Sequence, residues 1–281
     1  MTLKEFKEHF FKRLSPLYPA QELESFFRIL METYLGLSSI DVHLNPDKKI
    51  KLKKLDHLLA ALERLVHFEP LQYILGQTEF YGLHFTLNPN VLIPRPETEE
   101  LVEWILKDTD AGAHFNILDI GTGSGCIAVS LAKYLPLASV AALDVSEDAL
   151  TLSAHNAELN NAEVHFLQQN ILETKALQKS YDIIVSNPPY VRNLEKPEIE
   201  VNVLDYEPHL ALFVEDHDAL IFYRKIAELA KGALSPKGRL YVEINQYLAE
   251  ETQVLFTEFG FNEVELRNDF AGKPRMIKAS L

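Results

Sequence analysis

The chain has 281 residues, of which 47% are hydrophobic and 24% charged, a composition that excludes a disordered protein and suits one large or two smaller globular domains. Its net charge of −14 belongs to the second part, because residues 1–90 carry 11 basic and 11 acidic side chains whereas residues 91–281 carry 16 and 30. Enzymes that grip duplex nucleic acid cluster Lys and Arg against the phosphates. We therefore expect no direct contact with nucleic acid.

The first residues contain no apolar core of signal-peptide length, and no later run approaches the roughly 20 apolar residues that span a bilayer. We expect a cytoplasmic monomer without membrane contact. The single cysteine, Cys126, excludes an internal disulfide and reads as a packing residue, and the histidines lack metal-ligand spacing, so no metal is expected. The lysine-rich run at 48–54 favours a solvated linker or helix flank over a phosphate site.

Residues 1–69 predict a small helical domain. Thr2 and Glu5 form a capping box, and broad apolar stripes follow at helical spacing. Helices are expected from the Thr2 cap to about Leu14, over 21–36 and over about 55–68. The next segment, 70–96, reads as a connector, since alternation around Gly82 predicts a β-hairpin and several prolines then break regular structure.

From residue 97 onward, alternating helix and strand patterns predict an α/β domain, with a parallel sheet covered by helices on both faces. Strands are expected at 115–120, 139–144, 163–168, 181–186 and 238–244, with two more in 261–280. Helices are expected at 97–107, 124–135, 146–160, 217–232 and 246–259. Right-handed crossovers place the loops after the parallel strands along one edge of the sheet.

A glycine-rich loop follows the first of these strands, and glycines let the backbone turn tightly beside a ligand. Asp144, at the end of the next strand, can accept hydrogen bonds from both ribose hydroxyls. Position 126 is not the third glycine of the dinucleotide fingerprint, and no phosphate loop with its lysine is present. This favours a phosphate-free nucleoside such as S-adenosylmethionine over a dinucleotide. Asn170 either hydrogen-bonds the adenine amino group of S-adenosylmethionine or only forms a turn. The expected cofactor contacts are Asp119, Gly121, Thr122, Gly123, Ser124, Gly125, Asp144, Asn170 and Asn187.

The tetrapeptide Asn187-Pro188-Pro189-Tyr190 ends the apolar run 181–186. The prolines make it stiff and extended. The side-chain oxygen of Asn187 and the carbonyl of Pro188 can together accept both hydrogens of a planar amino group, and the ring of Tyr190 offers that plane a stacking face. We call this segment the clamp and expect it to bind the substrate, with Asn187, Pro188 and Tyr190 as catalytic residues. The alternative is a rigid strand exit with Tyr190 in the core.

The glycine loop, Asp144 and the clamp resemble class I S-adenosylmethionine-dependent methyltransferases that act on amino groups. The following segments are similar to the HemK/PrmC family of release-factor glutamine methyltransferases: 69–76, 80–82, 92–99, 206–208 and 267–270. The resemblance implies a Rossmann-like methyltransferase sheet with a small N-terminal helical domain and a β-hairpin connector. It also implies methylation of the glutamine side-chain amide (N5) in the Gly-Gly-Gln motif of peptide chain release factors, yielding S-adenosylhomocysteine. Asn170 departs from the aspartate common in the family.

Two other enzymes and one binding module remain as alternatives. Adenine N6 presents the same planar amino group, but a nucleic-acid methyltransferase predicts a basic recognition region, and none is visible. A ribosomal-protein glutamine methyltransferase shares the clamp but lacks the run at 95–99. The third alternative is a non-catalytic nucleoside-binding module, in which the clamp would have no evident purpose. Arg95 and Glu97 either steady the substrate loop or pair the connector with the catalytic domain, and Glu243 receives no role.

Overall fold

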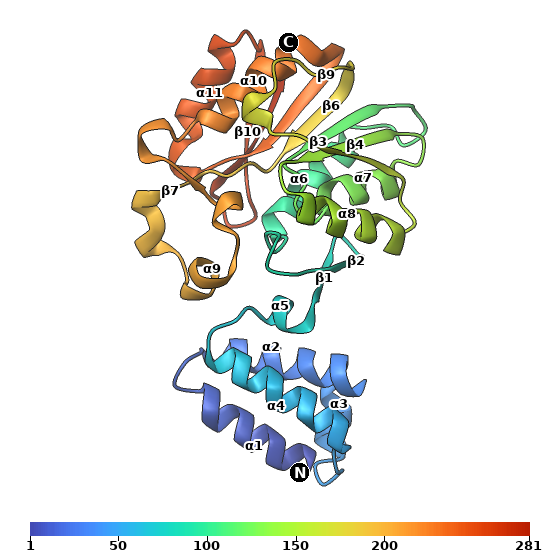
Figure 1. Cartoon of the computed structure of the whole chain (residues 1–281), viewed down its shortest axis with the longest axis vertical. Coiled ribbons are helices and arrows are strands. Elements are labelled where there is room, and N and C mark those ends of the chain that lie inside the picture. Colours follow the sequence, from blue (N-terminus) through green and yellow to red (C-terminus); the bar gives the residue numbers. More distant parts are fainter. The chain divides into compact units, whose positions relative to one another are not determined.

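A computed structural model describes residues 1–281, and the chain divides into two compact units. A helical unit contains Met1–Gly76 together with Val201–Tyr206, and a sheet unit contains Gln77–Glu200 together with Glu207–Leu281 (Figure 1). None of the helices is both long and apolar enough to cross a bilayer.

The helical unit is built on aromatic packing. Its helices are α1 (Leu3–Leu14), α2 (Ala20–Leu30), α3 (Ser39–Leu44), α4 (Leu52–Val66), α5 (Leu71–Leu75) and α9 (Val201–Tyr206). The predicted capping box is present, since the Glu5 amide donates to the Thr2 hydroxyl and the Thr2 amide donates to the Glu5 carboxylate. The rings of Phe6, Phe10 and Phe27 then contact one another in the buried core.

The helical unit differs from the sequence prediction in several places, one of which is α5, a short helix inside the segment 70–96 that was expected to be the connector. The predicted helix 21–36 is α-helical only to Leu30 and continues as a π-helical turn, Met31–Leu35, which Gly36 ends with a φ of 66°. Helix α3 was not predicted because it is short. Helix α9 lies far along the sequence, yet its Tyr206 hydroxyl donates to the His67 carbonyl at 2.7 Å.

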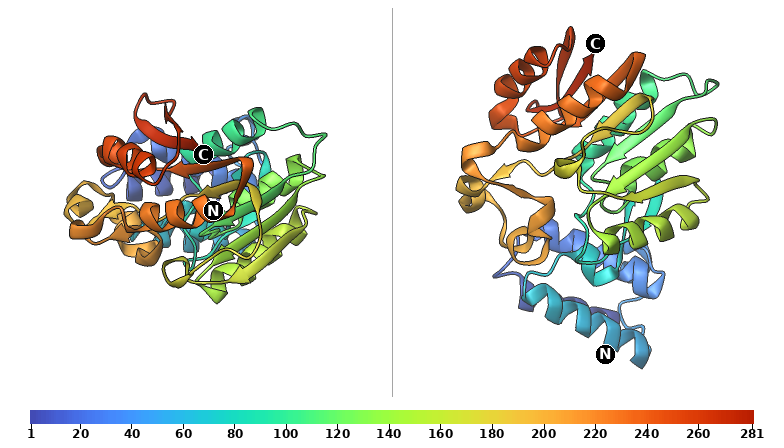
Figure 2. Two further views of the ribbon diagram at one scale, coloured as in Figure 1. Left: turned by 90° about the horizontal axis from the view of Figure 1, so that it is seen from above. Right: turned by 45° about the horizontal axis from the view of Figure 1, so that its top comes forward.

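The sheet unit contains a seven-stranded sheet in the order β10-β11-β9-β6-β3-β4-β5. Its strands are β3 (Asn116–Ile120), β4 (Ser139–Asp144), β5 (Val164–Gln168), β6 (Tyr181–Ser186), β9 (Leu234–Glu243), β10 (Glu263–Asn268) and β11 (Pro274–Ser280). The strands β9, β6, β3, β4 and β5 pair in parallel, and β11 is antiparallel to both β9 and β10. This confirms the predicted α/β sheet, which Figure 2 shows from two further directions.

Alternating side chains along the strands divide the core into two halves. The helices of the unit are α6 (Pro96–Lys107), α7 (Cys126–Tyr134), α8 (Glu147–Leu159), α10 (Ile221–Ala233) and α11 (Ala249–Glu258). On β6, Ile184 packs with α10 and α11, whereas Ile183 and Val185 pack with α6 and α7. Each face of the sheet is therefore covered, as the long apolar strands require.

The predicted hairpin is also present, as β1 (Gln77–Phe80) and β2 (Leu83–Thr86). Phe80 and Phe85 of this hairpin are buried in the core formed with α6 and α7, so the hairpin belongs to the sheet unit. A second small pair, β7 (Val191–Arg192) with β8 (Phe213–Val214), was not foreseen. The sequence also predicts a role for each segment: recognition for 1–69, connection for 70–96 and catalysis for 97–281. These roles stay a prediction.

Candidate functional site

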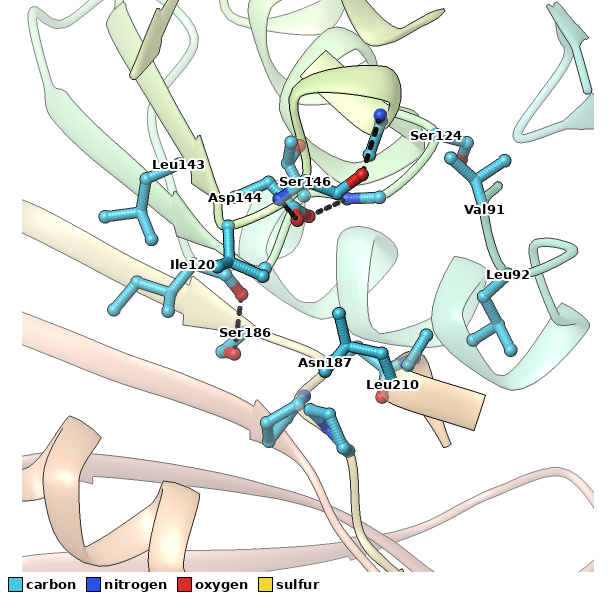
Figure 3. A pocket seen from close by; sticks show the side chains of 18 of the residues that line it. Val91, Leu92, Ile120, Ser124, Leu143, Asp144, Ser146, Ser186, Asn187 and Leu210 are labelled. Atoms are coloured by element: carbon cyan, nitrogen blue, oxygen red, sulfur yellow. Dashed lines mark hydrogen bonds between the residues drawn. The ribbon is translucent and has the colours of Figure 1, made fainter. Parts of the chain in front are cut away.

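The sheet changes its winding direction at β3. This strand pairs with β4 on one side and β6 on the other, both in parallel. In such sheets the carboxyl ends of the strands at this point open into a crevice where ligands bind. A cavity of about 440 Å³ lies there, and all of its lining residues belong to the sheet unit (Figure 3).

The glycine loop forms one wall of the cavity. Gly121, Gly123 and Gly125 all have positive φ, at 73°, 55° and 81°. A Cβ added to Gly121 or Gly123 would meet no atom within 4 Å, whereas one on Gly125 would lie 2.8 Å from Cβ of Ser153 on α8. The first two glycines therefore leave room beside the cavity, and the third permits close packing of α7 against α8.

Asp144 lies at the cavity, at the end of β4. Its Oδ2 accepts a hydrogen bond from the Gly123 amide at 2.9 Å, and its Oδ1 accepts one from the Ser146 amide at 3.0 Å. These two backbone donors fix the carboxylate between the glycine loop and the start of α8, as Figure 3 shows. Each oxygen retains a second lone pair, so Asp144 can still accept hydrogen bonds from a ligand.

Asp119 lies beneath the cavity rather than on its wall. The residue is fully buried and is absent from the lining. Its Oδ2 accepts a 2.7 Å hydrogen bond from the Thr122 hydroxyl, but its Oδ1 has no hydrogen-bond partner. Burial raises the pKa of Asp119 to about 7, the Thr122 hydrogen bond opposes this, and the charge of nearby Asp144 adds to it. The structure thus places a buried carboxylate with one unpaired oxygen under the glycine loop.

Asn170 lines the cavity after β5, but its side chain is occupied by local bonds. Its Oδ1 accepts from the Leu172 amide at 3.1 Å, and its Nδ2 donates to Glu173 at 2.9 Å. These bonds cap the short turn Ile171–Glu173. The turn-forming role is therefore visible in the structure, and the adenine contact stays a prediction.

The clamp occupies another part of the cavity wall. Asn187, Pro188 and Pro189 line the cavity, and the Ser186 hydroxyl anchors the strand end by donating to the Ile120 carbonyl at 2.7 Å. The side-chain oxygen of Asn187 and the carbonyl of Pro188 accept no hydrogen bond from the rest of the chain. Two acceptors are thus available at the cavity, as an amino-group site requires.

Tyr190 does not line the cavity. Its ring packs against the core shared with α10, and its hydroxyl donates to Glu243 at 2.9 Å. The predicted stacking face is therefore not brought to the cavity in this structure, which instead matches the alternative of a core tyrosine at a strand exit. The catalytic role of Tyr190 is not supported by its position.

Glu243 is a buried residue that sequence reasoning left without a role. It ends β9 with 1% of its surface exposed, and it accepts hydrogen bonds from the Tyr190 hydroxyl and, at 2.7 Å, from the Thr98 hydroxyl. Burial raises its pKa, while those two hydroxyls and the charge of Arg275 oppose the shift. The sequence contained one signal for a role of Glu243, which is its position: a carboxylate at the carboxyl end of a parallel strand lies at the edge of the sheet where ligands bind.

Arg95 pairs with a partner that the sequence did not reveal. Its guanidinium donates to Oε1 of Glu207, and the Ile93 amide donates to Oε2 of the same carboxylate at 3.2 Å. Glu207 is buried, at 4% exposed. Pro94 and Arg95 on one side and Pro208 on the other line the cavity, so the ion pair holds two cavity-lining segments together.

The structure also bears on two other kinds of chemistry, nucleophilic attack by the cysteine and metal binding. Burial raises the pKa of the Cys126 thiol to about 12, so the thiol stays protonated and unreactive. No group of three or more His, Cys, Asp or Glu side chains is placed to hold a metal ion.

The sheet unit resembles known methyltransferases. Residues 98–205 match the methyltransferase small domain family. The solved structure of a methyltransferase from Pyrococcus furiosus shares the fold, with a TM-score of 0.52 and 18% identity, covering 81% of this chain and 97% of that one. The fold and the matching domain define a methyltransferase of class I.

Comparison of the whole chain narrows this class. Residues 8–76 match the PrmC N-terminal domain. The release factor glutamine methyltransferase of Flavobacterium psychrophilum is 52% identical over 283 residues, covering 100% of this chain and 99% of that protein. Its counterpart from Bacteroides thetaiotaomicron is 44% identical over 268 residues, covering 95% and 96%. The chain belongs to the release factor glutamine methyltransferase family, which confirms the predicted resemblance.

Proposed function

We propose that the protein transfers a methyl group from S-adenosylmethionine to N5 of the glutamine in the Gly-Gly-Gln motif of peptide chain release factors. The observation that carries this proposal is the pair of open acceptors, Asn187 Oδ1 and Pro188 O, at the cavity that also contains the glycine loop and Asp144. Family membership over the full chain supports the substrate.

The residues around the cavity fit this cofactor. Gly121 and Gly123 leave open space where side chains would project, and Asp144 presents acceptors for ribose hydroxyls. The buried Asp119 carboxylate, with its unpaired Oδ1, provides negative charge for the cofactor's cationic groups once it is ionised, and burial raises its pKa to about 7. When bound, S-adenosylmethionine supplies a methyl group that its sulfonium leaving group has already activated.

The clamp's contribution is orientation. An amide nitrogen is a poor nucleophile because its lone pair is delocalised into the carbonyl. By accepting both N–H hydrogens, Asn187 and Pro188 aim that nitrogen, and such positioning can contribute up to roughly 7–11 kcal/mol. The nitrogen releases one proton to solvent once methylated, so no strong base is needed in the cavity.

The same two acceptors explain selection of glutamine. Glutamate would place carboxylate oxygens against two acceptor oxygens, with no hydrogens to share. Sites that hydrogen-bond a substrate group reject analogues lacking it by about 10⁴ or more. Glutamine is accepted and glutamate is excluded.

Recognition beyond the three-residue motif is assigned to the helical unit. A tripeptide alone cannot provide much affinity after the costs of association. The helical unit carries no part of the cavity lining, and it contains a groove of its own beside Lys7, Phe11 and Phe27. This unit is proposed to bind the release factor outside its Gly-Gly-Gln loop.

Intact-mass spectrometry tests the proposed function. A release factor incubated with the protein and S-adenosylmethionine should gain the mass of one methyl group, and the same factor with its motif glutamine changed to alanine should gain none. Methylation of the alanine variant, or of DNA or RNA instead of the factor, would reject the proposed substrate.

A further inference from the structure

A chain of hydrogen bonds runs behind the clamp. The Asn187 amide nitrogen donates to the Thr98 hydroxyl at 3.3 Å, that hydroxyl donates to Glu243 Oε2 at 2.7 Å, and the Tyr190 hydroxyl donates to Glu243 Oε1 at 2.9 Å. Thr98 and Glu243 are buried, at 2% and 1% exposed. These hydrogen bonds link three parts of the fold: the clamp, the first turn of α6, which contains Thr98, and the end of β9, which contains Glu243.

The direction of these bonds follows from the carboxylate at one end. The Thr98 and Tyr190 hydroxyls donate to the two oxygens of Glu243, one each, so Thr98 uses its single proton on Glu243. The Thr98 oxygen can then only accept from Asn187. An asparagine side chain has two different ends, an oxygen that accepts and an amino group that donates. Thr98 therefore holds the amino end, and the oxygen end is left for the cavity.

We propose that Thr98 and Glu243 are positioning residues, which fix the orientation of the Asn187 amide so that its oxygen, and not its nitrogen, meets the substrate amino group. This inference rests on the proposed function for its catalytic consequence. With the amide reversed, the Asn187 amino group would face the substrate amino group, donor against donor, and one of the clamp's two acceptors would be lost.

Tyr190 completes this arrangement from the other side of Glu243. Its hydroxyl donates to Oε1, so the two oxygens of the carboxylate receive one hydroxyl each. The Asn245 side chain in turn donates to the Tyr190 carbonyl at 3.0 Å and to Glu195. The last residue of the clamp is thus fixed through both its hydroxyl and its carbonyl, while its first residue is oriented through Thr98.

The first test measures the orientation directly and does not depend on activity. In protein labelled with ¹⁵N-asparagine, the side-chain NH₂ signal of Asn187 is identified by its loss in Asn187→Ala. In the ligand-free protein, one Hδ2 should be protected from solvent exchange by Thr98. That protection should vanish in Thr98→Val, which keeps the shape without the hydroxyl, and persist in Thr98→Ser.

Glu243→Gln provides a second variant for the same measurement. A glutamine at 243 can donate to the Thr98 oxygen, which frees the Thr98 proton to reach Asn187 Oδ1 and reverses the amide. Protection should therefore also decrease in Glu243→Gln. Protection that is unchanged in both Thr98→Val and Glu243→Gln would overturn the inference.

The second test measures catalysis on intact release factor. Thr98→Val should lower kcat by at least about tenfold with cofactor affinity changed less than about twofold, and Thr98→Ser should keep most of kcat. In an Asn187→Ala background, Thr98→Val should have almost no further effect, because it acts only through Asn187. Equal losses in both backgrounds would refute positioning. Failure of the wild-type protein to methylate glutamine would reject the proposed function and leave the exchange result intact.

Discussion

The hydroxyl of Tyr190 donates a 2.9 Å hydrogen bond to Oε1 of Glu243 and turns the tyrosine away from the cavity. Its neighbours Asn187, Pro188 and Pro189 line the cavity, whereas Tyr190 packs with the core near α10. The clamp therefore has one part that lines the cavity and one part that anchors it in the core. Tyr190 belongs to the anchor.

Tyr190→Phe tests this division. The variant keeps the ring but leaves a buried carboxylate with one donor fewer, which should lower the free energy of unfolding by about 1–3 kcal/mol. Denaturant titration measures this change, and turnover should fall less than about tenfold. A large loss of turnover with unchanged stability would instead place the hydroxyl at the substrate.

Asn187→Ala removes one acceptor of the clamp. We expect cofactor affinity to stay within about threefold, because the glycine loop and Asp144 are untouched, and turnover to fall by about a hundredfold or more. Calorimetry and methyl-transfer assays measure the two effects separately. Asn187→Asp is the matched control, since it keeps an acceptor but cannot donate to Thr98, and it should also lose turnover. Wild-type turnover in the alanine variant would remove Asn187 from the clamp.

Gly125→Ala should destabilise the sheet unit. Its added Cβ would lie 2.8 Å from Cβ of Ser153, and its φ of 81° disfavours any side chain. We expect a loss of about 1–3 kcal/mol in denaturant unfolding. Gly232→Ala in α10 is the control, since its Cβ would meet nothing within 4 Å, and it should gain about 0.4–1 kcal/mol. Equal effects of the two substitutions would contradict the packing role of Gly125.

The titration of Asp119 should make stability and cofactor affinity depend on pH with opposite signs. Because burial raises its pKa from 3.8 to about 7, its contribution to stability is full below pH 3.8 and is lost as pH rises through about 7. Affinity for a cationic cofactor should increase over the same interval near pH 7, because the carboxylate then becomes charged. Unfolding measured from about pH 4 to 8 and cofactor binding measured from about pH 6 to 8 should show the two trends.

Asp119→Asn is the control for these pH effects. The amide cannot ionise, so both pH dependences should flatten in the variant. A binding profile that keeps its slope near pH 7 in Asp119→Asn would assign the titration to another group.

Truncation of the helical unit tests its proposed role. Removal of residues 1–76 should raise KM for intact release factor and spare a short glutamine peptide. Because Tyr206 donates to the His67 carbonyl, the truncation also removes a partner of α9, so Tyr206→Phe in the full chain is the needed control. Equal losses on factor and peptide would contradict a recognition role.

Most of the sheet could be predicted because its signals are local. The strands 139–144 and 181–186 agree residue by residue with β4 and β6, since apolar runs followed by Asp144 or by the clamp mark their ends clearly. The glycine loop, Asp144 and three clamp residues were also correctly brought to one cavity. These features depend on chain order and on the common edge of a parallel sheet.

The rest of the site depends on contacts between distant parts of the chain. Thr98 and Glu243 are 145 residues apart, and Arg95 and Glu207 are 112 apart, so no local pattern joins them. The position of the Tyr190 side chain could not be predicted for the same reason. The sequence shows an aromatic residue beside a binding segment, but only the position of Glu243 decides which way the hydroxyl points.

The path of the backbone has a consequence for engineering and for evolution. The chain passes from the helical unit to the sheet unit after Gly76, returns for Val201–Tyr206 and leaves again before Glu207. The polypeptide therefore links the two units three times. A chimera that exchanges only the N-terminal segment between two relatives would leave α9 of one parent in a foreign helical unit. Transplanting the unit intact requires two separate fragments of the gene.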